Sequence, residues 1–149
     1  MEFNIQIRGL LTLVEKLVQY PEIAAPILLR AISESQAVLA QNTNRSTVPW
    51  RTGWLVQSFR WAQQDLTGYW FPTASYAGYV EFGTAPHVIE AKDAKALYWP
   101  GAQHPVKRVN HPGTKANKYL ERIINASEQG INDVFAQALD QIVQQIATA

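Results

Sequence analysis

The stretch FRWAQQDLTGYWFPTASYAGYVEFGTAPHVIE, residues 59–90, decides the fold. In its first half, Phe59 and Trp61 alternate with polar residues, which is the period of a strand with one buried face. A second aromatic run, residues 69–71, follows the turn-forming residues 65–68. Two aromatic runs separated by a short polar turn are typical of paired strands. This half of the stretch therefore predicts a β-hairpin.

The second half of the stretch predicts a change of chain direction. Tyr76, Tyr79 and Phe82 are spaced by three, which gives one apolar face to one or two helical turns. Gly83 permits a turn that ends the helix, and Pro86 favours an extended chain leading into the next strand. The segment shows no catalytic pattern, so we interpret it as a structural device that turns the chain.

Downstream, the chain predicts two more strands and a long loop. Residues 87–89 and 96–99 are short apolar runs. Residues 100–118 hold three prolines, two glycines and four basic residues, a composition that favours an extended loop with a short strand at 106–109. The strands together predict a small, mostly antiparallel sheet.

The N-terminal part predicts one strand and two helices. Residues 2–8 alternate between polar and apolar side chains, as a half-buried strand does. An amphipathic helix that ends before Pro21 is indicated by Leu10, Leu13, Val14 and Leu17. We expect a second helix from near Pro26, in its first turn, to about Asn42, with one face formed by Leu28, Ile32 and Leu39.

From Tyr119 onward the chain predicts one helix of about thirty residues. Gly130 is its weak point, because glycine costs about 1 kcal/mol relative to alanine inside a helix. The expected apolar face consists of Leu120, Ile124, Ile131, Val134, Phe135, Ala138 and Ile142.

These elements predict a single α+β domain over residues 1–149, since a chain of 149 residues fits one domain. Residues 1–47 supply a strand and helices, 48–118 the sheet and long loop, and 119–149 the C-terminal helix. We expect a small, mostly antiparallel sheet with a hairpin, packed against two N-terminal helices and a long C-terminal helix.

The composition excludes several classes of protein. A hydrophobic content of 47% is typical of a globular chain and not of a disordered or fibrous one. The absence of cysteine excludes disulfide scaffolds, thiolate zinc sites and cysteine nucleophiles. Neither a signal peptide nor an uninterrupted apolar stretch of membrane-spanning length is visible, so we expect an intracellular protein without membrane contact. Charged residues are only 17%, which suggests that neighbouring subunits cover part of the surface.

The charge is distributed unevenly, although the net charge is only +1. Residues 45–118 carry nine basic and four acidic groups, whereas residues 119–149 carry one and four. The basic middle is either a surface that faces nucleic acid or a solvated loop region. Its basic and aromatic residues alternate as in a nucleic-acid platform, although core packing explains most of the tryptophans equally well: Arg45, Trp50, Arg51, Trp54, Arg60 and Trp61, then Lys107, Arg108, Lys115 and Lys118.

No enzyme motif is present, and we expect no catalytic residues. The three histidines, His87, His104 and His111, lie near acidic residues, so a small metal-assisted hydrolase is one alternative, but their spacing is not diagnostic of a metal site. On a strand, His87 and Glu90 would point to opposite faces, whereas metal ligands must converge. Structural or surface histidines are therefore the preferred interpretation.

Two stretches of the chain are distinctive: YAGYVEFGTAPHVIEAKDAKALYWPG, residues 76–101, and VNHPGTKANKYL, residues 109–120. Through them the chain resembles the tail-component or neck family of tailed bacteriophages. Residues 52–58 resemble the family's TG-x-L-x-x-S pattern, and residues 7–21 its opening helix. The chain departs from the family at Trp54, where a polar residue is common, and in its short loop after Trp99.

The resemblance implies a non-enzymatic structural protein of the virion, present in the host cytoplasm during assembly and without a cofactor. It implies a homo-oligomeric ring of six or twelve subunits around the DNA passage, between the head connector and the tail terminator or tail-tube proteins. The family motif and our assembly hypothesis select contact residues: Thr52, Gly53, Tyr76, Tyr79, Val80, Glu81, Phe82, Gly83, Thr84, His87, His111, Pro112 and Gly113. We expect weak, non-specific contact with packaged DNA through charges facing the lumen, among Arg45, Arg51, Lys107 and Arg108. The alternative is a nucleic-acid-binding module that uses the basic, aromatic middle segment.

Overall fold

The computed structural model describes residues 20–92 and 94–148 and confirms the α+β class. The expected strand at 2–8 and helix at 10–17 lie outside these residues. In chain order the described elements are α2 (Pro21–Asn42), α3 (Trp54–Gln57), β1 (Phe59–Gln64), β2 (Thr67–Pro72), α4 (Ala77–Phe82), β3 (His87–Glu90), β4 (Arg108–His111) and α5 (Tyr119–Thr148).

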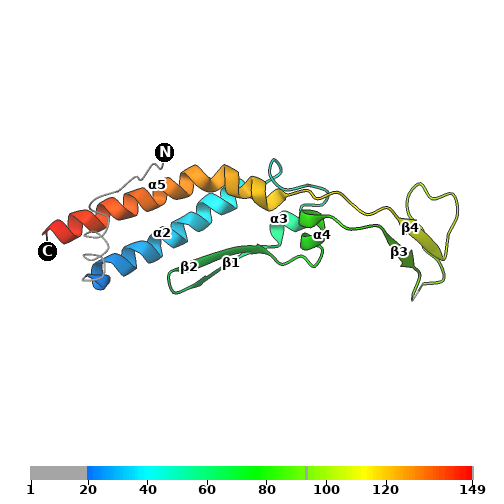
Figure 1. The fold of residues 1–149 in the computed structure, drawn as a ribbon, viewed down its shortest axis with the longest axis horizontal. Helices are drawn as coiled ribbons and strands as arrows, with labels where there is room; N and C mark the ends of the chain where they lie inside the picture. The colour runs from blue at the N-terminus through cyan, green and yellow to red at the C-terminus, as the bar shows by residue number, and fades with distance from the viewer. Residues whose placement is uncertain (1–19, 93, 149) are drawn as a thin grey trace, which may run out of the picture.

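The described part of the molecule is elongated (Figure 1). At one end α2 and α5 lie side by side, with the β1–β2 hairpin along α2. Two extended segments lead from the middle of the molecule to β3 and β4 at the other end. We call residues 84–114 the arm, and residues 20–83 and 115–148 the body.

The helix α2 begins at Pro21, five residues before the expected start at Pro26. Pro21 occupies the start of the helix, where a backbone N–H has no helical partner in any case. Pro26 therefore lies inside the helix, at a cost of about 3 kcal/mol. Residues on both sides of it, Ala24 and Ile27, are buried against α5 together with Ala31, and this burial offsets the cost.

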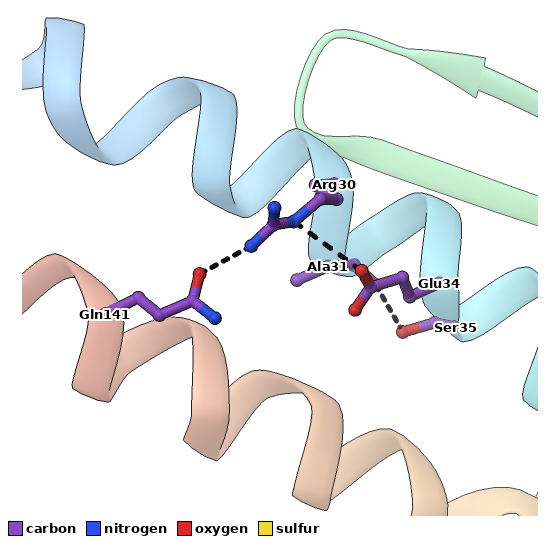
Figure 2. A network of polar contacts seen from close by, with 5 residues as sticks. All are labelled: Arg30, Ala31, Glu34, Ser35 and Gln141. Atoms are coloured by element: carbon purple, nitrogen blue, oxygen red, sulfur yellow. Dashed lines mark hydrogen bonds and ion pairs between the residues drawn. The ribbon is translucent and has the colours of Figure 1, made fainter.

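The two long helices are joined by apolar contacts and by one polar link. Ala138 and Ile142 of α5 complete the cluster formed by the buried face of α2. Arg30 on α2 donates to Oε1 of Gln141 on α5 at 2.5 Å and lies 3.5 Å from the Glu34 carboxylate (Figure 2). By length and composition α2 is apolar enough to span a membrane, contrary to our expectation, but a core helix of a soluble protein meets the same criteria.

The C-terminal helix runs from Tyr119 to Thr148, as expected, but its buried face differs from the prediction. Ile123 is 1% exposed and Ile124 is 61% exposed, so the expected position of Ile124 in the core is wrong. Either of two adjacent isoleucines fits the helical stripe in the sequence. The side of α5 that packs against Val48, Leu55 and Phe59 decides which one is buried. The helix passes Gly130 without interruption. Val38 of α2 occupies the space where a side chain at this position would lie, so a glycine lets the two helices approach closely.

The predicted hairpin is confirmed. β1 and β2 pair antiparallel from Phe59 opposite Pro72 to Gln64 opposite Thr67. Phe59 stacks on Trp70 with ring centroids 5.5 Å apart and packs edge-on against Tyr119. The second cluster of buried residues forms around these rings and consists of Val48, Leu55, Phe59, Ala77, Tyr119 and Ile123.

The expected single sheet is two separate two-stranded ladders. β3 and β4 pair antiparallel from His87 opposite His111 to Glu90 opposite Arg108. The expected strands at 96–99 and 106–109 are wrong in extent, because the first is reduced to one bridge between Leu97 and Val106, and β4 begins at Arg108. None of the described residues of the arm is fully buried, so no core holds longer strands in place.

Candidate functional site

The base of the arm is formed by two segments that are thirty residues apart in sequence. The N–H of Thr84 donates to the Thr114 carbonyl at 3.0 Å, and the N–H of Thr114 donates to the Thr84 carbonyl at 3.1 Å. The two threonine hydroxyl oxygens are 3.2 Å apart. Residues 76–101 and 109–120, the two stretches singled out in the sequence, therefore meet in space, at a point we call the junction, formed by residues 80–84 and 113–120.

Two glycines permit this close approach. Gly83 and Gly113 have φ angles of +75° and +84°, which glycine adopts without strain. A Cβ atom on Gly83 would lie 2.3 Å from the Thr114 carbonyl oxygen, and one on Gly113 would lie 2.2 Å from the Thr84 carbonyl oxygen. Each glycine thus makes room for the threonine of the opposite segment. The sequence predicted the turn at Gly83 but not this reciprocal packing.

Glu81 connects the junction to the start of α5. Its side chain is buried, and its Oε2 accepts a hydrogen bond from the Leu120 N–H at 3.0 Å. The backbone carbonyls of Val80 and Glu81 accept from the N–H groups of Asn117 and Lys118 at 3.0 and 3.2 Å. A carboxylate that reaches the first turn of a helix satisfies a free N–H there and interacts favourably with the helix dipole. Glu81 therefore fixes α4 to α5.

Tyr119 is the buried aromatic residue of the junction and keeps its proton. Its hydroxyl donates to the Ala77 carbonyl at 3.3 Å. Burial raises the pKa of Tyr119 to about 12, with smaller contributions from the charges of Glu81 and Tyr76. The phenol thus acts as a neutral hydrogen-bond donor between α5 and α4.

Sequence reasoning missed Arg122, which ties the exit loop of α2 to the start of α5. Its Nε donates to the Thr47 carbonyl at 2.8 Å, and its terminal nitrogens donate to the carbonyl and side-chain oxygens of Asn117. The available signal was that Arg122 is the one basic residue in residues 119–149. A lone arginine among acidic residues is a candidate for a structural link.

A groove of about 990 Å³ lies beside the junction. Seven of the expected contact residues line it: Tyr76, Tyr79, Val80, Gly83, Thr84, His87 and His111. Two others, Thr52 and Gly53, line a second hollow that also includes Tyr76 and Val80. Phe82 belongs to the junction and is 78% exposed, and Pro112 lines a hollow on the arm. The structure therefore gathers most of the motif residues around the base of the arm.

The two histidines of the arm are engaged with the backbone. Their rings face each other across β3 and β4 with centroids 5.0 Å apart. Nδ1 of His87 donates to the Ala85 carbonyl at 2.9 Å, and Nδ1 of His111 accepts from the Gly113 N–H at 3.1 Å. Within residues 20–92 and 94–148, no group of three or more histidine and acidic side chains is placed to hold a metal ion.

The four expected lumen charges fall into two pairs. Arg45 and Arg51 lie on the body, where the Arg45 guanidinium is 4.2 Å from the centre of the Trp50 ring. Lys107 and Arg108 lie on the arm, where Arg108 makes a 3.8 Å ion pair with Glu90. The structure does not bring the two pairs together.

The tryptophans are more exposed than core packing predicts. Trp50, Trp54 and Trp99 are exposed, and Trp61 and Trp70 are half-buried, so none belongs entirely to the core. Trp50 and Trp54 line the second hollow together with Arg51. This combination of aromatic rings and positive charge is suited to contact with bases or with another protein surface.

Comparison with known proteins gave no match to a family model, a curated protein or a solved structure.

Proposed function

We propose that the chain is a structural protein of a tailed-bacteriophage virion that forms a ring of six or twelve copies in the neck, between head connector and tail. The ring surrounds the DNA passage and contacts connector or head-closure proteins on one side and tail terminator or tail-tube proteins on the other. The protein assembles in the host cytoplasm, becomes part of the virion, and acts without catalysis or cofactor.

One observation carries this proposal: the motif residues build a junction that holds an exposed arm away from the body. The described part of the arm has no fully buried residue, yet it displays Val88, Tyr98 and Trp99 to solvent. Exposed apolar side chains on a projecting segment are typical of surfaces that another protein covers. The low charged content of the chain agrees with such coverage.

The proposal is tested by removing the end of the arm without disturbing the junction. The register of β3 and β4 places Glu90 opposite Arg108, so residues 91–107 can be replaced by Asn-Gly, a turn that joins paired strands. Deleting residues 102–110 is less suitable, because it removes most of β4.

We expect the shortened chain to keep its helical circular dichroism and to lose assembly. The full chain should form rings, alone or with connector and tail-tube proteins, visible by electron microscopy and measurable by light scattering. A full chain that remains monomeric in every mixture would contradict the proposal, and rings of the shortened chain would contradict the role of the arm.

For the lumen of the ring we propose Arg45 and Arg51, since Trp50 supports the position of Arg45. Their contact with packaged DNA should be weak and should decrease as salt rises. Replacing both by glutamine should leave ring formation intact and reduce DNA retention in assembled particles.

The second candidate function is a nucleic-acid-binding module, and the exposed Trp50 and Trp54 beside Arg51 favour it. It predicts that the isolated monomer binds single-stranded DNA at low salt. Replacing both tryptophans by alanine should then weaken binding by about 1–3 kcal/mol per stacked base. The half-buried Trp61 is the control, because its replacement should change stability more than binding.

A further inference from the structure

We propose that the arm of one copy binds the exposed face of α5 on a second copy, so that copies associate head to tail. The inference rests on the proposed function, which requires copies to associate, and it deepens that function by naming the two surfaces that meet.

The arm is basic. Residues 84–114 carry four basic and two acidic residues, and Lys115 and Lys118 follow at its base. The basic residues of the arm are Lys92, Lys95, Lys107 and Arg108, and all four are exposed. Among the described residues of the arm, the one ion pair joins Arg108 to Glu90, and both side chains remain more than half exposed. A net positive charge therefore remains on the arm.

The opposing surface on α5 is acidic. Residues 123–148 contain three acidic residues and no lysine or arginine. These residues, Glu128, Asp133 and Asp140, are exposed, and no cation in the described part of the chain lies within ion-pair distance of them. Asp133 and Asp140 are seven residues apart and share one side of the helix. Opposite charge on the arm would steer it to this surface.

Both surfaces also expose apolar side chains. Ile124, Leu139 and Val143 of α5 are 61%, 40% and 47% exposed. The arm carries a hollow of about 510 Å³ whose apolar lining comes from Ile89, Leu97, Tyr98, Trp99, Val109 and Pro112. An apolar side chain of α5 inserted into this hollow would remove both groups from water. A hollow of this kind favours a protein partner over the DNA backbone as the occupant of the basic arm.

The arm cannot reach this surface of α5 within its own chain. The arm and the C-terminal half of α5 lie at opposite ends of the described structure (Figure 1). Two complementary patches at opposite ends of one chain give a head-to-tail contact, which closes into a ring when the rotation between copies permits it.

Charge reversal tests the contact directly. One variant carries K92E, K95E and K107E on the arm, and the other carries E128K, D133K and D140K on α5. Arg108 is left unchanged so that its pair with Glu90 is preserved. All six positions are exposed, so both variants should keep the circular dichroism of the parent chain.

We expect each variant alone to lose self-association in light scattering at low salt, and an equimolar mixture to regain it. A chain carrying all six reversals has the parent net charge and should also associate, which separates a matched contact from an effect of total charge.

The absence of cysteine permits a second measurement. A Y98C chain mixed with an L139C chain should form a mixed disulfide under mild oxidation. The matched control is L29C, since Leu29 of α2 is 38% exposed and lies outside the proposed contact. Equal cross-linking of the Y98C chain to the L139C chain and to the L29C chain would overturn the proposed surface.

The outcomes also separate this contact from the proposed function. If rings still form in the chain that carries either set of reversals, the proposed contact is overturned and the proposed ring stands. The parent chain could instead form open assemblies that each single-surface variant loses and the six-reversal chain recovers. That result would support the contact and overturn the ring. A parent chain that never self-associates, alone or with neck components, would overturn both.

Discussion

Replacing Gly130 by alanine sets two opposing effects against each other. In an unobstructed helix interior, alanine is more favourable than glycine by about 1 kcal/mol. In this chain the new Cβ would lie 2.8 Å from Cγ1 of Val38, which is closer than unstrained carbon atoms approach. Valine has one strongly preferred rotamer in a helix, so Val38 cannot turn aside and α2 and α5 must separate locally. Overpacking of this kind costs about 1–3 kcal/mol. We therefore expect Gly130→Ala to leave the free energy of unfolding unchanged or to lower it by up to about 2 kcal/mol.

Urea unfolding followed by circular dichroism measures this change, and Val38→Ala supplies the control. Val38→Ala removes the methyl groups that the new Cβ would meet. In the Val38→Ala background, Gly130→Ala should therefore raise the free energy of unfolding by about 1 kcal/mol, the intrinsic preference of the helix. A double-mutant cycle gives the difference as a coupling energy. If Gly130→Ala stabilises the parent chain to the same extent, the two helices do not approach as closely as described.

Three further predictions concern the junction. Glu81→Gln should lower the free energy of unfolding by about 1 kcal/mol, because an amide lacks the charge that favours the start of α5. Urea unfolding measures this change and shows whether the Leu120 N–H needs a carboxylate as its acceptor. Gly113→Ala should lower the free energy of unfolding by about 1–3 kcal/mol, because this position has a positive φ and lies against Thr84. Hydrogen exchange of the Thr84 N–H should accelerate, and unchanged exchange would show that the junction tolerates a side chain. Burial raises the pKa of Tyr119 to about 12, so the folded chain keeps a proton that unfolded tyrosine loses near pH 10. The free energy of unfolding should therefore fall as pH rises from about 10 to about 12, and it should fall less in Tyr119→Phe; parallel pH profiles would refute the assignment.

Local signals in the sequence were sufficient for the elements that are determined by neighbouring residues. The hairpin follows from aromatic alternation around a two-residue turn, and α4 ends at Phe82 because Gly83 follows it. The long C-terminal helix begins at Tyr119 as its periodicity predicted. In each case the residues that decide the element lie within a few positions of one another.

The sequence could not predict features that depend on partners far along the chain. Ile123 and Ile124 fit the same helical stripe, and the packing of Val48, Leu55 and Phe59 against one side of α5 selects Ile123. In the sequence, Gly130 is only a weak point of the helix. The fold shows that Val38 occupies the space opposite it. Most of the motif residues lie together around the base of the arm, but the pairing of Gly83 with Thr114 and of Glu81 with Leu120 required the fold.

The way the arm joins the body determines where the molecule would yield under mechanical load. A pull on the tip of the arm acts on β3 and β4 in the same direction, so it does not shear the bonds between them. The force passes through residues 83–87 to α4 and through residues 111–118 to α5. Because Glu81 bonds to Leu120, both paths load the same few hydrogen bonds. The first element to detach under tension should therefore be α4, while the arm itself stays paired.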